Sequence, residues 1–74
     1  MKGVTAMMYT IEFKNPVLNT QDVIGWNITT GQAGVWSGLH GERAYFPLLS
    51  EVARFMRILK AEGYNTADMN VVKV

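Results

Sequence analysis

The sequence contains no cysteine among its 74 residues. Disulfide bonds and thiolate metal sites are therefore excluded, and the composition favours a reducing compartment. A strong net charge is missing as well, because seven Lys and Arg residues face six Asp and Glu residues. A chain with a net charge of +1 has neither the basic balance of a general nucleic-acid-binding protein nor the acidic balance of a nucleic-acid mimic.

Long apolar runs are also absent, and no stretch approaches the roughly 20 apolar residues of a membrane-spanning helix. Lys2 is not followed by the apolar segment of a secretory signal. We therefore expect a cytoplasmic protein without membrane contact. Its length indicates one domain, residues 8–74, after a flexible leader of residues 1–7. Met7 and Met8 are alternative starts to Met1.

The stretch from residue 47 to residue 62 has the clearest pattern in the chain and predicts an amphipathic helix. Its apolar residues recur with the helical period: Leu48, Leu49, Val52, Phe55, Met56 and Leu59. Pro47 favours a helix start, although no Ser, Thr, Asp or Asn precedes it to cap the first turn. Gly63 predicts the helix end, with Tyr64 folded back against Leu59.

Alternation of apolar and polar residues predicts strands at residues 8–14, 23–30 and 35–39, a short extension at 44–46, and a last strand at 69–74. Turn residues occupy 31–34 and 40–43. We therefore expect an α+β fold with a small single-layer, mainly antiparallel sheet and one helix packed on one face, in the chain order β-β-β-α-β. The first three strands should form a meander, and the last strand should join an edge.

The simplest burial scheme places one face of this sheet under the helix, namely Tyr9, Ile11, Phe13, Ile24, Trp26, Ile28, Val35 and Leu39. The opposite face then exposes an apolar set: Met8, Val23, Trp36, Met69 and Val71. Because contiguous exposed apolar patches usually mark interaction sites, we expect this face to bind a second copy of the chain or another protein. The alternative is that residues 17–22 and the leader fold over it.

Basic side chains follow the expected outer face of the helix at Arg54, Arg57 and Lys60, with Arg43 upstream. One interpretation is a solvated face on which Glu51 pairs with Arg54. The other is contact with a nucleic-acid backbone, with Trp36 or Tyr45 as a stacking surface. Ile58 is the apolar residue among these cations and is a candidate anchor for a partner.

Catalytic and metal-binding residue types do not cluster in the sequence. His40 is the single histidine, and one imidazole with scattered carboxylates does not form a metal site. Ser37, His40 and Glu42 lie too close along one strand and turn to converge as a catalytic set. Gly31 and Gly34 suit a hairpin turn, because a phosphate-binding loop would also need a lysine and a helix N-terminus. We therefore expect no enzyme activity, cofactor, metal or small-molecule substrate.

These observations predict a small non-enzymatic protein-interaction module. Small cytoplasmic regulators and inhibitors, including those of phages and mobile elements, are of this size and composition class, so we expect a regulator or inhibitor that forms a homodimer or binds a protein partner. The alternative is a nucleic-acid-binding protein that uses the basic helix face with Arg43, Arg54, Arg57, Ile58 and Lys60.

Overall fold

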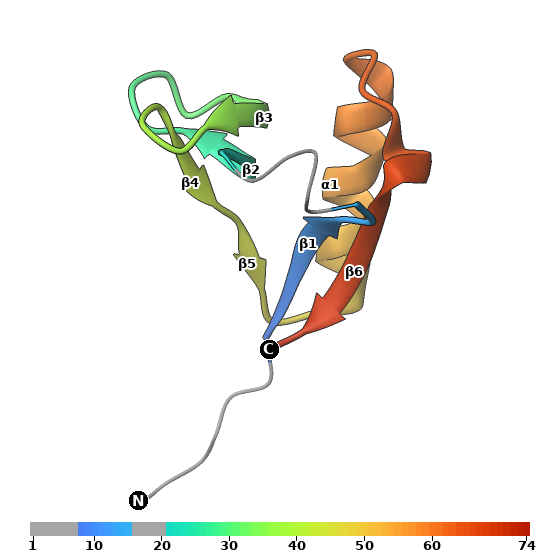
Figure 1. Cartoon of the computed structure of the whole chain (residues 1–74). Helices are drawn as coiled ribbons and strands as arrows, with labels where there is room; N and C mark the ends of the chain where they lie inside the picture. Colours follow the sequence, from blue (N-terminus) through green and yellow to red (C-terminus); the bar gives the residue numbers. More distant parts are fainter. Residues whose placement is uncertain (1–7, 16–20) are drawn as a thin grey trace, which may run out of the picture.

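The computed structural model describes residues 8–15 and 21–74, and this part of the chain forms six strands, one α-helix and one 3-10 turn (Figure 1). The elements are β1 (Tyr9–Phe13), β2 (Asp22–Asn27), β3 (Ala33–Ser37), β4 (Gly41–Arg43), β5 (Tyr45–Phe46), α1 (Leu49–Ala61), the 3-10 turn η2 (Thr66–Asp68) and β6 (Met69–Lys73). The predicted α+β class is confirmed. The predicted leader, residues 1–7, and most of the segment 17–22 lie outside the described residues.

The strands form two antiparallel sheets of three strands, in the orders β5-β1-β6 and β3-β2-β4, in place of the single layer that we expected. β2 and β3 form the predicted hairpin. The predicted pairing of the first two strands is wrong, because β1 pairs with β5 and β6. The last strand does lie at a sheet edge, as predicted. Residues 41–46 run from one sheet into the other, since β4 pairs with β2 and β5 pairs with β1.

The two sheets meet at Ala44, which is buried between β4 and β5. Its N–H donates to the carbonyl oxygen of Ile24 at 3.2 Å, and its carbonyl oxygen accepts from Thr10 Oγ1 at 2.7 Å. Arg43 Nε donates to the same Thr10 hydroxyl at 3.1 Å, and the guanidinium forms an ion pair with Glu12. Backbone and side-chain hydrogen bonds from both sheets therefore converge on one short segment.

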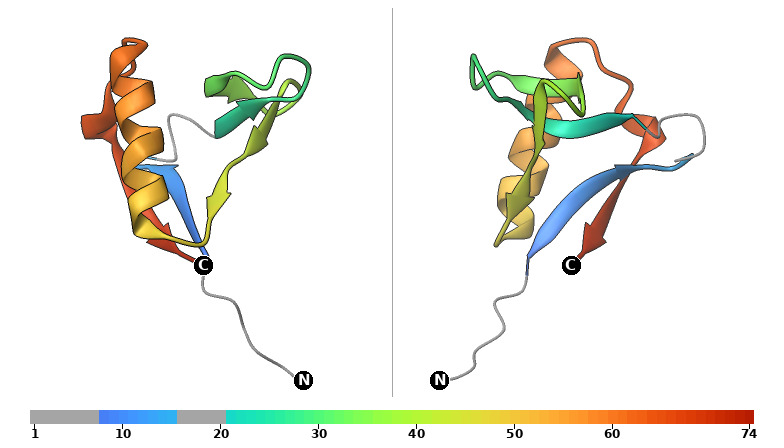
Figure 2. Two further views of the ribbon diagram at one scale, coloured as in Figure 1. Left: turned by 180° about the vertical axis from the view of Figure 1, so that it is seen from behind. Right: turned by 60° about the vertical axis from the view of Figure 1, so that its left-hand side comes forward.

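Helix α1 lies on one side of the strands (Figure 2) and contacts β1, β3 and β5. Its buried face is supplied by Val52, Phe55 and Leu59. The apolar core comprises Ile11, Ile24, Ala33, Ala44, Phe46, Val52, Phe55, Leu59 and Met69. Two members of the predicted apolar stripe, Leu48 and Leu49, are more than half exposed. Leu48 has extended backbone angles before the first turn, so it departs from the helical stripe, and Leu49 lies at the stripe's edge. The helix in this part of the chain is too short to cross a membrane.

Both ends of α1 follow the local sequence. Leu48 precedes the first turn without a side-chain cap, as the absence of a capping residue predicts. At the other end Gly63 has a φ of 95°, and its N–H donates to the Lys60 carbonyl at 3.1 Å. The Tyr64 N–H donates to the Leu59 carbonyl at 3.0 Å, and its ring packs against the core. These two bonds form a Schellman motif, so the predicted helix end is confirmed.

The β2–β3 turn begins earlier than the sequence suggests. Asn27 Oδ1 accepts hydrogen bonds from the N–H groups of Thr29 and Thr30, both at 2.9 Å, and Gly31 adopts a φ of 74°. Ile28 therefore lies in a turn, and Leu39 lies in the turn after β3. Their side chains are 60% and 84% exposed, so the expectation that they pack under the helix is wrong.

Candidate protein-interaction groove

The apolar face predicted opposite the helix does not exist as one surface. Met69 is 6% exposed and belongs to the core. Val71 pairs directly with Ile11, and directly paired residues of an antiparallel sheet point to the same face. Because Ile11 faces the core, Val71 also lies on the core side, at the exposed edge strand β6. Met69 and Val71 share one face of the last strand, as the alternation predicts, but alternation does not say which face meets the helix.

The other members of that predicted set are divided between the two sheets. Val23 and Trp36 are cross-strand partners in the β3-β2-β4 sheet, whereas the Met8 carbonyl accepts from the Val74 N–H at the end of the β1–β6 pair. Both Val23 and Trp36 are half-buried. A Cβ added at Gly41 would lie 2.6 Å from Trp36 Cβ and from Val23 Cγ2, so β4 closely covers this pair.

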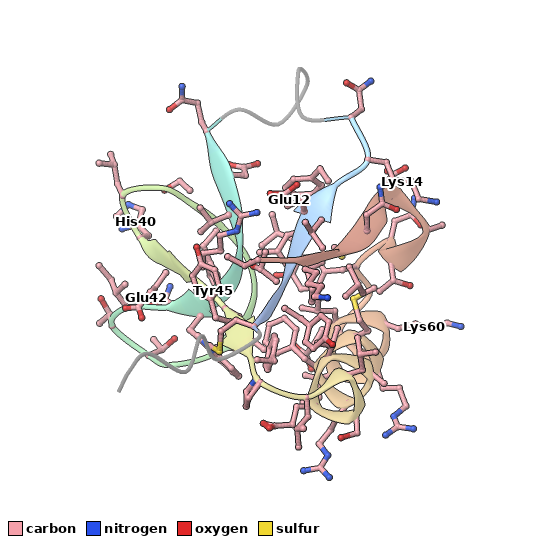
Figure 3. All side chains as sticks on the ribbon, turned by 90° about the horizontal axis from the view of Figure 1, so that it is seen from below. Glu12, Lys14, His40, Glu42, Tyr45 and Lys60 are labelled. Carbon is pink, nitrogen blue, oxygen red and sulfur yellow. The ribbon has the colours of Figure 1, made fainter. Side chains whose placement is uncertain are left out.

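The predicted basic row is present in part. Arg54, Arg57 and Lys60 are exposed on α1, and Lys60 projects away from the fold on the side opposite His40 and Glu42 (Figure 3). Arg43 does not join them, because its guanidinium is bonded to Glu12 and Thr10. The Glu51–Arg54 ion pair that we considered is not formed, and neither side chain has an ion-pair partner among the residues that the structure describes.

A groove with a volume of about 230 Å³ lies between α1 and strands β2 and β5. Four helix residues line one side at positions i, i+3, i+4 and i+7, and two aromatic residues line the other. The lining residues are Glu51, Arg54, Phe55, Ile58, Trp26 and Phe46. The sequence placed Trp26 and Phe55 in the core and Arg54 and Ile58 on the outer helix face, so their convergence was missed. Phe46 and Glu51 carried no sequence signal for a shared site.

Aromatic rings form the base of the groove. The ring centroids of Trp26 and Phe55 are 4.8 Å apart with planes at 76°, and those of Phe46 and Phe55 are 5.1 Å apart. Edge-to-face packing of this kind is a favoured arrangement of aromatic pairs. Phe46 and Phe55 are buried, whereas Trp26 is 37% exposed and Ile58 is 44% exposed. The apolar surface open to solvent therefore comes from one residue on each wall.

The rim of the groove carries one charge of each sign. Glu51 is half-buried and Arg54 is exposed, and both project from the helix side. These two side chains offer no pairing of a nucleophile with a base. Among the described residues there is also no group of three or more His, Asp or Glu side chains that could hold a metal ion.

The size of the groove limits its occupant. Its volume of about 230 Å³ lies below the roughly 300–1,000 Å³ of small-molecule sites and matches one or two side chains of a partner better. An apolar floor, exposed Trp26 and Ile58, and charges at the rim make up the residue types that protein interfaces use.

Comparisons with protein-family models, with curated proteins and with solved structures find no match to this chain.

Proposed function

We propose that the protein is a non-enzymatic protein-interaction module that binds through the groove between α1 and strands β2 and β5. The observation that carries this proposal is the exposure of Trp26 and Ile58 on opposite walls above an aromatic floor. An apolar side chain inserted between them would remove both from water, at a gain of about 25 cal/mol per Å² of apolar surface. Tryptophan in a partly desolvated pocket is a typical hot-spot residue of interfaces.

Charges at the rim would orient the partner. Glu51 and Arg54 have no ion-pair partner among the described residues, so each is available to a group of opposite charge on another protein. Such pairs at a rim contribute to specificity and association rate more than to affinity. A small protein that occupies a partner's surface in this way would act as a regulator or inhibitor.

Display of random peptides tests the groove directly. The protein is immobilised at low density so that neighbouring copies do not meet, and bound peptides are sequenced. We expect the wild type to enrich peptides with an apolar anchor flanked by charged residues, and Ile58→Glu to abolish the enrichment because it places a charge on the groove wall. Lys60→Glu is the matched control, since Lys60 is exposed on the same helix but does not line the groove.

Circular dichroism of both variants shows whether each has kept its fold. A folded Ile58→Glu variant that enriches the same peptides as the wild type would place binding elsewhere and contradict the proposal. Absence of any enrichment by a wild type that is also monomeric in solution would contradict it as well.

Nucleic-acid binding is the second candidate, and the exposure of Arg54, Arg57 and Lys60 along one helix favours it. Trp26 shares the groove with Arg54 and offers a ring on which a base can stack. Fluorescence anisotropy with a single-stranded RNA oligonucleotide tests this candidate. Binding should weaken steeply with salt and be lost in the double variant Arg54→Glu plus Arg57→Glu. RNA binding that survives the double variant would show that the helix face is not the contact surface. Absence of RNA binding by the wild type at low salt would exclude this candidate function.

A further inference from the structure

We infer that helix α1 of a second copy of this chain packs against α1, antiparallel about a two-fold axis between Glu51 and Arg54, and places side chains in the groove. This inference rests on the proposed function for the location of the surface and adds the identity of the occupant. It is carried by the arrangement of charge and exposed apolar residues along one side of α1.

The two charges at the rim of one copy are complementary to the same two charges on a second copy. Glu51 and Arg54 lie three residues apart on the groove side of α1, and neither is paired within the described part of the chain. A two-fold rotation between them sets Glu51 of each copy opposite Arg54 of the other. A surface for nucleic acid would carry only positive charge at this point, whereas a rim with one charge of each sign fits its own copy.

The same rotation matches exposed apolar residues across the axis. Ile58 lies about 8 Å along the helix from the axis and Leu48 about 7 Å in the other direction, from a rise of 1.5 Å per residue. Ile58 of one copy therefore meets Leu48 of the other, which is 57% exposed. Leu48 precedes the first turn of α1 and Phe55 is 2% exposed, so the contact between the two helices consists of the paired charges and the pairing of Ile58 with Leu48 on either side of them.

Helix packing alone would not hold this dimer. The 13 residues of α1 provide less than two heptads of seam. The opposite wall of the groove adds to the contact, because Trp26 lines it and is 37% exposed. The short seam indicates a weak dimer, so dissociation should be measurable at micromolar concentrations.

Sedimentation equilibrium with charge-exchanged variants tests the inference. We expect the wild type to dimerise reversibly. Glu51→Arg and Arg54→Glu each place like charges opposite one another, so each alone should weaken the dimer by about tenfold or more. An equimolar mixture of the two variants should form a heterodimer, and the double variant that carries both substitutions should recover wild-type affinity. A dimer built from any other surface would not show this reciprocal rescue.

Lys60→Glu is the control, because it changes the net charge by the same amount as Arg54→Glu but lies outside the groove. It should leave the dimer unchanged. A monomeric wild type at all concentrations, or a dimer that both single variants leave intact, overturns the inference. If the wild type is monomeric but captures peptides in an Ile58-dependent manner, the occupant is another protein, and the proposed function stands without the dimer. If neither dimer nor peptide binding is found, both fail.

Discussion

Gly25 occupies the position where β2 comes closest to the segment that links the sheets. A Cβ at this residue would lie 2.0 Å from the Glu42 carbonyl oxygen and 2.6 Å from the Ala44 nitrogen. Both neighbours are backbone atoms, which cannot rotate away as a flexible side chain can. The strand pairing of Gly25 with Arg43 therefore depends on the missing side chain.

We expect Gly25→Ala to lower the free energy of unfolding by about 3 kcal/mol, the upper part of the range for overpacking, because the added methyl group must displace backbone. Urea denaturation monitored by circular dichroism measures the loss. Gly38→Ala is the control, since its added Cβ would meet the Gln21 carbonyl oxygen at 3.4 Å, an ordinary contact. It should remain within about 1 kcal/mol of the wild type. Equal losses in the two variants would show that close approach is not the reason for Gly25.

Helix α1 is bounded by signals of unequal strength. Its start lacks a side-chain cap, whereas its end is closed by the two hydrogen bonds of the Schellman motif around Gly63. Gly63 has a positive φ, and no atom lies within 4 Å of an added Cβ, so a substitution there meets no steric obstacle from the rest of the fold. The cost of replacing Gly63 is therefore conformational.

We expect Gly63→Ala to lower the free energy of unfolding by about 1 kcal/mol, because a side chain in the left-handed region costs about 1–2 kcal/mol. Gly63→Asn should lose less, since asparagine tolerates this region. Thermal or urea denaturation of the two variants at equal protein concentration gives the difference. An alanine variant as stable as the wild type would mean that the helix end has moved to a conformation without a positive φ.

The features of the elements that the sequence predicts correctly are those that depend on residues close together in the chain. The helix, its end at Gly63 and the β2–β3 hairpin depend on residues close in the chain, and all were found. Strand pairing across long separations was not, because period-two alternation in β1 is the same whichever strand lies beside it. The same ambiguity placed Met69 and Val71 on the wrong face, since alternation defines two faces without saying which one is covered.

The groove is a property of the whole molecule. The sequence predicts some of its residues in the core and others on the outer helix face, and it does not predict that they meet. Trp26 comes from β2, Phe46 from β5 and the rest from α1, so their proximity results from the packing of α1 against the strands. Ile58 was recognised as an exposed apolar residue, but no sequence pattern joins it to Trp26. In the inferred dimer the groove walls are covered, while Arg57 and Lys60 of each copy do not line the groove and remain available on the outer sides.

The passage of residues 41–46 from one sheet into the other has a consequence for how the protein opens. β2 bonds to the first half of this segment and β1 to the second, and the Ala44 amide and carbonyl take part in bonds to each side. Opening of either sheet breaks hydrogen bonds at Ala44 and loosens the segment that also supplies a strand to the other sheet. The molecule should therefore lack independent subglobal opening of the two sheets, so amide protons in β1 and β2 would exchange with solvent through the same cooperative event.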